Sequence, residues 1–218
     1  MFKQIPAKDT SNIIDVGGGY GRFSNLYNQY FKGCVLLDPS DKLLKKAKQK
    51  NINLSLVKGE AEDIPFPNGY FDVALLIRVA HHLQNFAVAI EEIQRVLKPG
   101  GYFILEFPNK IHLKGRLMSL FGLREVLFDL SPIDRRSQKE IEQGTVPFYN
   151  YHPYWVLRIL ESRGWEKIDK LSVSNFRHPI FKALLSDKSL LYLEKKVQQP
   201  FSLLNLGPSI FLLLKKRA

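Results

Sequence analysis

A single cysteine, Cys34, occurs in the 218 residues of the chain. One thiol excludes an internal disulfide and a cysteine-rich metal cluster, and it is typical of proteins from a reducing compartment. Long hydrophobic runs are also lacking, because the most apolar stretch, residues 201–214, is too short for a membrane span and contains Gly207 and Pro208. No secretory signal is visible at the N-terminus. We therefore expect a soluble, cytoplasmic protein with no transmembrane segment.

Acidic residues are scarce relative to basic ones, 21 against 32, which gives a formal net charge of +11. A positive field of this size attracts phosphates, carboxylates, nucleic acid or an anionic membrane surface. Most basic runs are nevertheless solvated helix faces, and the sequence contains no recognised nucleic-acid-binding module. Nucleic acid is therefore unsupported as a partner, and the charge alone identifies none.

Short apolar runs alternate with segments of helical periodicity along the chain. Strands are expected at residues 13–16, 35–37, 54–57, 71–77, 102–107, 165–173 and 209–215. Helices are expected at residues 22–31, 41–50, 86–97, 155–162 and 187–197. This alternation predicts an α/β, doubly wound, Rossmann-like fold around a mostly parallel seven-stranded sheet. Such sheets bind ligands beyond the carboxyl ends of their strands.

A glycine cluster follows the first expected strand, in the order Asp15-Val16-Gly17-Gly18-Gly19-Tyr20-Gly21. Glycines at a strand-to-helix turn let the backbone approach a ligand closely, because no Cβ stands in the way. The dinucleotide fingerprint would need glycine at position 22, where the chain has Arg22. The hypothesis that the protein is a nicotinamide-dependent dehydrogenase is therefore the least favoured.

Acidic residues follow the second and third strands. Asp38, with Pro39 after it, stands where a carboxylate can accept hydrogen bonds from the two hydroxyls of a ribose. A helix N-cap or a turn aspartate is an equally good reading of Asp38 taken alone. An acidic loop, residues 59–66, comes after the third strand.

Together these residues resemble the class I S-adenosylmethionine-dependent methyltransferases, in particular the ubiquinone and menaquinone biosynthesis C-methyltransferase group. The resemblance covers roughly the first half of the chain. Its motifs are Asp15-x-Gly17-x-Gly19-x-Gly21, Asp38, Gly59-Glu60-Ala61-Glu62-Asp63-Ile64-Pro65-Phe66, Phe71-Asp72-Val73, His81-His82-Leu83 and Val96-Leu97-Lys98-Pro99-Gly100-Gly101.

The resemblance implies S-adenosyl-L-methionine as the cofactor. It implies that the glycine turn, with Asp15, Gly17, Gly18, Gly19 and Gly21, holds the methionine portion. Asp38 and Pro39 are then expected at the ribose, and Glu60, Ala61 and Glu62 at the adenine. Glu60 departs from the aspartate that is more common at its position, which makes its contact less certain than that of Asp38.

Two adjacent histidines follow the fourth strand. If the acceptor is an alcohol, a phenol or a carbon acid, His81 or His82 could take its proton. The favoured alternative is that a histidine caps the next helix or contacts the cofactor. Adjacent histidines cannot share one helix face at ligand spacing, and no carboxylate pattern accompanies them, so we expect no metal site.

Arg78 departs from the apolar or small residue that the family usually has before the histidines. An arginine that faces the pocket would suit an anionic substrate or the carboxylate of the cofactor. An ion pair with Glu106 or Asp15 is at least as good a reading.

We expect one methyltransferase domain: residues 1–108 form the cofactor-binding half, residues 109–151 an inserted helical lid without a clear strand, and residues 152–218 complete the fold. Only a dozen residues precede the first strand, so the lid or a second subunit of a homodimer is expected to cover the cofactor. The predicted function is methyl transfer to an unidentified small molecule, anionic or amphipathic. The alternatives are an RNA- or protein-directed methyltransferase and a non-catalytic, cofactor-binding regulatory subunit.

Overall fold

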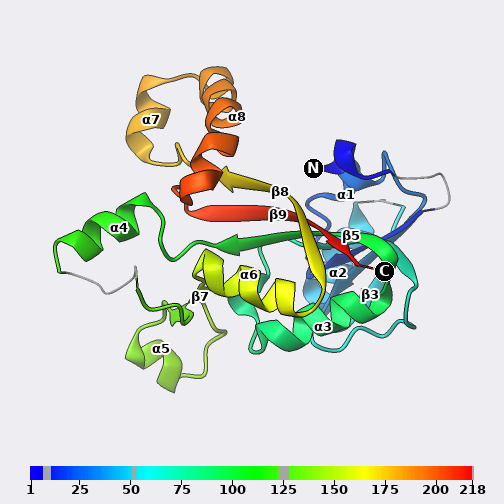
Figure 1. Cartoon of the computed structure of the whole chain (residues 1–218). Coiled ribbons are helices and arrows are strands. Elements are labelled where there is room, and N and C mark those ends of the chain that lie inside the picture. The colour runs from blue at the N-terminus through cyan, green and yellow to red at the C-terminus, as the bar shows by residue number, and fades with distance from the viewer. Residues whose placement is uncertain (7–10, 51–52, 123–127, 218) are drawn as a thin grey trace.

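The computed structural model describes residues 1–6, 11–50, 53–122 and 128–217. Its centre is a seven-stranded sheet with the order β3-β2-β1-β4-β5-β9-β8 (Figure 1). The strands are β1 (Asn12–Val16), β2 (Gly33–Asp38), β3 (Ser55–Lys58), β4 (Phe71–Leu76), β5 (Leu97–Pro108), β8 (Trp165–Val173) and β9 (Ser209–Lys216). The pairs among β1 to β5 are parallel, whereas β9 is antiparallel to both β5 and β8. The predicted mostly parallel, seven-stranded α/β sheet is confirmed.

Both faces of the sheet are covered, because successive side chains of a strand point to opposite faces. In β1, Ile14 packs in a core with residues of α3 (Phe86–Val96) and α6 (Pro153–Ser162). Its neighbour Ile13 packs on the other side with Tyr27 of α1 (Ser24–Tyr27) and Phe31. Strands buried on both faces have no polar alternation, which is why they read as short continuous apolar runs.

The largest differences between the observed and the expected helices occur in α1, α7 (Pro179–Leu184) and α8 (Asp187–Leu204). The α-helix α1 is shorter than residues 22–31, because the chain turns after Tyr27, where Tyr30 N–H donates to Tyr27 C=O. By contrast, α8 is seven residues longer than expected and continues through Pro200 to the left-handed residue Asn205. The helix α7 was not expected, and α2 (Asp41–Gln49) agrees with the prediction.

The segment that follows β5 contains α4 (Leu113–Leu120) and α5 (Gln138–Glu142), and its residues 123–127 lie outside the described part. The expectation that it has no strand is wrong, because β6 (Ile133–Asp134) and β7 (Tyr149–Asn150) pair as an antiparallel ribbon. Strands of two residues are too short to produce a readable hydrophobic period. We refer to residues 109–151 as the lid segment.

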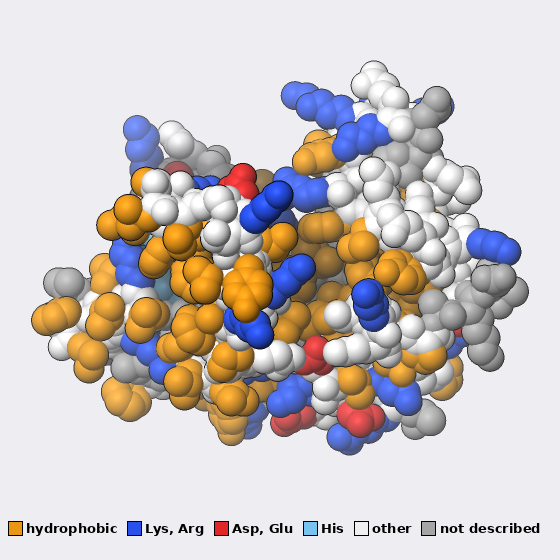
Figure 2. All heavy atoms as spheres, turned by 90° about the horizontal axis from the view of Figure 1, so that it is seen from above, with side chains coloured by type: hydrophobic (Ala, Val, Ile, Leu, Met, Phe, Trp, Pro, Cys, Tyr) orange, Lys and Arg blue, Asp and Glu red, His pale blue; other side chains and the backbone are white. Residues whose placement is uncertain are grey.

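The surface agrees with the net positive charge. Seen from above, far more Lys and Arg than Asp and Glu side chains stand out, with hydrophobic side chains between them (Figure 2). No helix in the described ranges is long and apolar enough to cross a membrane.

Candidate functional site

The glycine turn leads from β1 toward α1 at the carboxyl edge of the sheet. Gly17, Gly19 and Gly21 have φ angles of 69°, 59° and 73°. Only glycine adopts such left-handed conformations without steric cost. The N–H groups of Gly17 and Gly18 both donate to the carbonyl of Leu37, at 2.7 and 3.2 Å. The turn is therefore fastened to the end of β2.

A carboxyl group without a complete set of partners lies under this turn. Asp15 is only 2% exposed, and its Oδ2 atom has no hydrogen-bond partner. Burial, together with the nearby charge of Asp38, raises the pKa of Asp15 to about 7. A Cβ on Gly18 would lie 2.8 Å from the same Oδ2 atom. The buried Tyr27 hydroxyl also lacks a hydrogen bond of good geometry and interacts with the Asp15 carboxyl, lowering the pKa of that carboxyl against the effect of burial. A ligand with an N–H donor would complete the partners of Oδ2.

Asp38 is buried at the end of β2 and is held by the backbone on both sides. Its Oδ2 accepts from Gly19 N–H and its Oδ1 from Ser40 N–H, each at 2.9 Å. The helix-cap reading is wrong, because Ser40 caps α2 and accepts from Leu43 N–H. A carboxylate has about four acceptor positions. Two of them remain for hydroxyl groups of a ligand.

A first cavity of about 460 Å³ lies beside these residues. Its lining comes from the glycine turn, the acidic loop, the residues after β4 and the lid segment: Gly17, Pro39, Gly59, Glu60, Ala61, Glu62, Val79, His82, Leu83, Gln84, Asn85, Val88 and Val146. Apolar walls with carboxylates beside them suit a flat heteroaromatic ring that carries N–H donors. Five of the predicted cofactor residues line this cavity, namely Gly17, Pro39, Glu60, Ala61 and Glu62. The other predicted cofactor residues are not in its lining: Asp15, Gly18, Gly19, Gly21, Asp38 and Arg78.

The two histidines belong to η2 (Ala80–His82), directly after β4. His82 borders the first cavity, whereas His81 borders a second cavity of about 490 Å³. Burial, with the charges of His82 and Arg78, lowers the pKa of His81 to about 4. His81 is therefore neutral at physiological pH. Neither histidine caps the next helix, because Asn85 is the N-cap of α3.

The lid segment contacts both histidines. His82 Nδ1 lies 2.9 Å from the carbonyl oxygen of Pro147, and the Phe148 ring centroid is 4.8 Å from that of His81. A carbonyl only accepts hydrogen bonds, so Nδ1 must carry the proton in this contact. In neutral His82 the Nε2 atom is then left without a proton.

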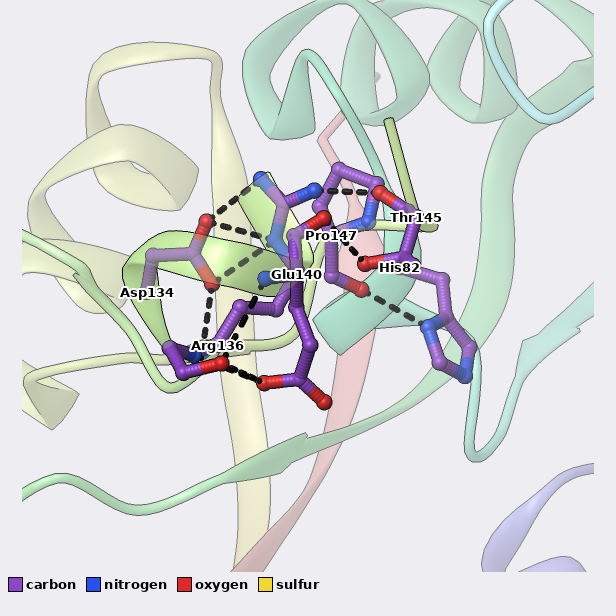
Figure 3. A network of polar contacts seen from close by, with 7 residues as sticks. His82, Asp134, Arg136, Glu140, Thr145 and Pro147 are labelled. Atoms are coloured by element: carbon purple, nitrogen blue, oxygen red, sulfur yellow. Dashed lines mark hydrogen bonds and ion pairs between the residues drawn. The ribbon is translucent and has the colours of Figure 1, made fainter. Parts of the chain in front are cut away.

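Side chains brace the lid segment on its way to this contact (Figure 3). Arg136 pairs with Asp134 at 2.6 Å and also donates to the carbonyl of Thr145. Ser137 and Glu140 form a capping box at the start of α5, and the Thr145 hydroxyl donates to the Glu140 carbonyl. These contacts fix the chain on both sides of α5 and so position the carbonyl that His82 meets.

Arg78 lies apart from the predicted cofactor residues. It borders the second cavity rather than the first, and its φ of 63° is left-handed. Its backbone N–H donates to Glu106 at 2.8 Å. The predicted ion pair is wrong, because no ion pair within the described ranges joins the Arg78 guanidinium to Glu106 or Asp15. Those ranges also contain no cluster of three or more His, Cys, Asp or Glu residues that could hold a metal ion.

Comparisons with known proteins agree with this geometry. Residues 14–105 match the family described as a methyltransferase domain. This match covers less than half of the chain. It is 37% identical over 120 residues to the ubiquinone/menaquinone biosynthesis C-methyltransferase of Shewanella frigidimarina, which is 49% of this chain and 46% of the relative. It is 29% identical over 110 residues to the uncharacterized methyltransferase YcgJ of Bacillus subtilis, 48% and 44% of the two chains.

Solved structures establish the methyltransferase fold over the whole chain. A methyltransferase from Mesorhizobium loti is similar with a TM-score of 0.69 at 15% identity, covering 99% of this chain and 95% of that one. The Bacillus subtilis YcgJ protein gives 0.64 at 16% identity, covering 100% and 97%. The chain spans about half the length of the curated relatives that it matches in sequence.

Two residues were missed by sequence reasoning although they hold the acidic loop. Arg95 of α3 donates to the carbonyls of Ile64 and Phe66, at 2.8 and 2.7 Å. Glu92 accepts from Ile64 N–H at 2.9 Å and pairs with Arg95. The available signal was the i, i+3 spacing of opposite charges on α3, which is too common on helices to indicate a role.

Proposed function

We propose that the chain binds S-adenosylmethionine and transfers its methyl group to a small molecule. The observation that carries the proposal is the pair of cavities at the carboxyl edge of the sheet, of which the first is bordered by His82 and the second by its neighbour His81. The first cavity is bordered by the glycine turn and the acidic loop, and the second by the lid segment. Each volume is in the range of small-molecule sites.

Residues of the glycine turn, the end of β2 and the acidic loop fit the cofactor, although Asp15 and Asp38 themselves are not in the lining of the first cavity. The free acceptor positions of Asp38 suit the ribose hydroxyls, and the loop from Glu60 to Glu62 suits the edge of an adenine. The unpartnered Oδ2 of Asp15, under the glycine turn, suits an ammonium group such as that of the methionine portion. When bound, the cofactor supplies an electrophilic methyl group on a sulfonium.

The contribution of the protein to catalysis is mainly to position the methyl donor and the acceptor. Methyl transfer from a sulfonium is an in-line displacement, so alignment of donor and acceptor provides much of the rate. His82 Nε2 is the proton acceptor available beside the first cavity if the methylated atom carries a proton. Val146, on the lid segment, borders the same cavity, so movement of the lid segment would change access to it.

Calorimetric titration with S-adenosylmethionine and S-adenosylhomocysteine tests the proposal. We expect Asp38→Ala to weaken binding at least about tenfold, because two charge-assisted hydrogen bonds are lost. Asp41→Ala is the matched control, since Asp41 is exposed and pairs only with Lys58. NAD should not bind.

The outcomes separate the alternatives. No binding of either cofactor form to well-folded protein would overturn the proposal. Binding without conversion to S-adenosylhomocysteine, with any acceptor offered, would favour a regulatory subunit. Conversion only with RNA or protein would replace the small-molecule acceptor by a macromolecule.

A further inference from the structure

The second cavity is built from segments that are far apart in the sequence. It lies among the carboxyl end of β5, α4, the β6–β7 ribbon and the loop after β8. Its lining is Arg78, His81, Glu106, Pro108, Lys110, His112, Lys114, Gly115, Met118, Ile133, Arg135, Phe148, Asn150, Ser174, Arg177, Pro208 and Ser209. The first cavity and its cofactor residues do not account for this composition.

Cationic side chains far outnumber carboxylates in the lining. Four of them form no ion pair with any carboxylate in the described ranges, and we call them the four cations: Arg78, Lys114, Arg135 and Arg177. Lys110 is different, because it is buried and pairs with Asp129 at 2.8 Å. Glu106 is the single carboxylate among the described lining residues. The cavity therefore has a surplus of positive charge.

The surplus of positive charge does not come from the exposed face of one helix. The four cations come from four different elements: the end of β4, α4, the turn after β6 and the loop before α7. Like charges that converge on one hollow repel each other unless an anion joins them. Arginine forks match the oxygens of carboxylates and phosphates in particular.

Backbone strain points to the same place. Among the described residues, three that are not glycine have a positive φ: Arg78 at 63°, Ser174 at 64° and Asn205 at 53°. Two of them border the second cavity. Left-handed conformations cost side-chain-bearing residues about 1–2 kcal/mol and are concentrated at functional sites. The N–H bond to Glu106 helps to hold Arg78 in this conformation.

Apolar side chains complete the lining. Met118, Ile133 and Phe148 stand beside the cations, as do two prolines. His81 adds no charge, because it is neutral at physiological pH. A ligand that satisfies all of these surfaces is an anion with a hydrophobic body.

We propose that the second cavity binds a methyl acceptor that joins a carboxylate or phosphate to an apolar body, with the oxyanion held by the four cations. The inference rests on the proposed function, because it assigns the acceptor class to the same site. A free organic anion and an anionic amphiphile share this chemistry. The probes must therefore measure the contribution of the anionic group and that of the apolar body to binding separately.

Calorimetric titration with octanoate, octyl phosphate, octanol and inorganic phosphate, in the presence of S-adenosylhomocysteine, tests the proposal. We expect octanoate and octyl phosphate to bind at least tenfold more tightly than octanol, and inorganic phosphate more weakly than octyl phosphate. The double variant Arg78→Gln/Arg177→Gln should weaken binding of the organic anions at least tenfold. Lys182→Gln/Lys188→Gln removes the same charge outside the cavity and should change it less than twofold.

Equal affinity for octanoate and octanol, or equal losses in the two double variants, would overturn the proposal. The same titrations report on the proposed function separately. Intact binding of S-adenosylhomocysteine without anion binding would overturn the acceptor site alone. Anion binding by protein that does not bind S-adenosylhomocysteine would overturn the proposed function and leave the anion selectivity supported.

Discussion

His82 Nδ1 meets the carbonyl oxygen of Pro147 at 2.9 Å across 65 residues of sequence (Figure 3). One hydrogen bond thus ties the residue after β4 that borders the first cavity to the lid segment. The same bond decides which nitrogen of His82 carries a proton. The position of the lid segment and the tautomer of neutral His82 are therefore coupled.

Two substitutions separate the hydrogen bond that His82 makes to the lid segment from its role as a proton acceptor. His82→Asn keeps an amide nitrogen near the Nδ1 position, whereas His82→Gln keeps one near Nε2. We expect Asn to preserve and Gln to lose hydrogen-exchange protection in residues 134–147, by about fivefold for a bond worth about 1 kcal/mol. Equal protection in both variants would show that the bond does not hold the lid. If Nε2 takes a proton during turnover, His82→Asn should lose activity although its lid is ordered.

We expect alanine substitutions of Gly17, in the glycine turn, and of Gly100, in β5, to lower the free energy of unfolding by different amounts. Gly17 and Gly100 have similar φ angles, 69° and 73°, but a Cβ on Gly17 would lie 2.4 Å from a methyl of Val79 and one on Gly100 would meet nothing within 4 Å. Gly100→Ala should cost about 1–2 kcal/mol of unfolding free energy and Gly17→Ala about 1–3 kcal/mol more. Urea denaturation measures both. Adding Val79→Ala to Gly17→Ala should recover part of the loss, and no recovery would exclude the clash as its cause.

Asp15 predicts a pH dependence of stability. The unfolded carboxyl loses its proton near the ordinary pKa of 3.8, whereas burial keeps the folded one protonated up to about 7. Between these values the folded state holds more protons, so its unfolding free energy falls as pH rises. Asp15→Asn, which cannot ionise, should therefore gain stability relative to the wild type at pH 8 but not at pH 4. Denaturation at the two pH values tests this, and Asp41→Asn, at an exposed site, should show no such gain.

Tyr151 makes a hydrogen bond beneath the two histidines that we expect to stabilise the folded state. Its buried hydroxyl donates to the carbonyl of Ala80 at 2.7 Å. Tyr151→Phe should cost about 1 kcal/mol, because Ala80 C=O keeps a second donor from Leu83 N–H. The expected fall in melting temperature is about 2–4 °C for a chain of this size. Tyr149→Phe is the control, and an equal fall there would remove this bond as the explanation.

The strands, the glycine turn and the position of the acidic loop were predictable because each depends on local sequence. Buried parallel strands read as apolar runs, and the turn at Gly17 to Gly21 needs conformations that only glycine adopts freely. Asp38 and the acidic loop follow their strands directly, so chain order predicts their common edge of the sheet.

The remainder depends on contacts between distant residues. Neither the two-residue strands β6 and β7 nor the carbonyl of Pro147 has a sequence signal of its own. The continuation of α8 through Pro200 is equally unmarked. Arg78 was visible as an unusual residue, but its neighbours Lys114, Arg135 and Arg177 become neighbours only through the fold.

The lid segment begins and ends at one place. Lys110 N–H donates to Tyr151 C=O at 2.8 Å, and Tyr151 N–H donates to Pro108 C=O at 2.9 Å. The two ends of the lid segment are therefore held next to each other by backbone hydrogen bonds that involve none of the residues between them. Segments of other length or composition could join the same two chain ends without altering the register of the sheet. Residues 111–150 are therefore the natural unit to exchange with the corresponding segment of another protein of this fold.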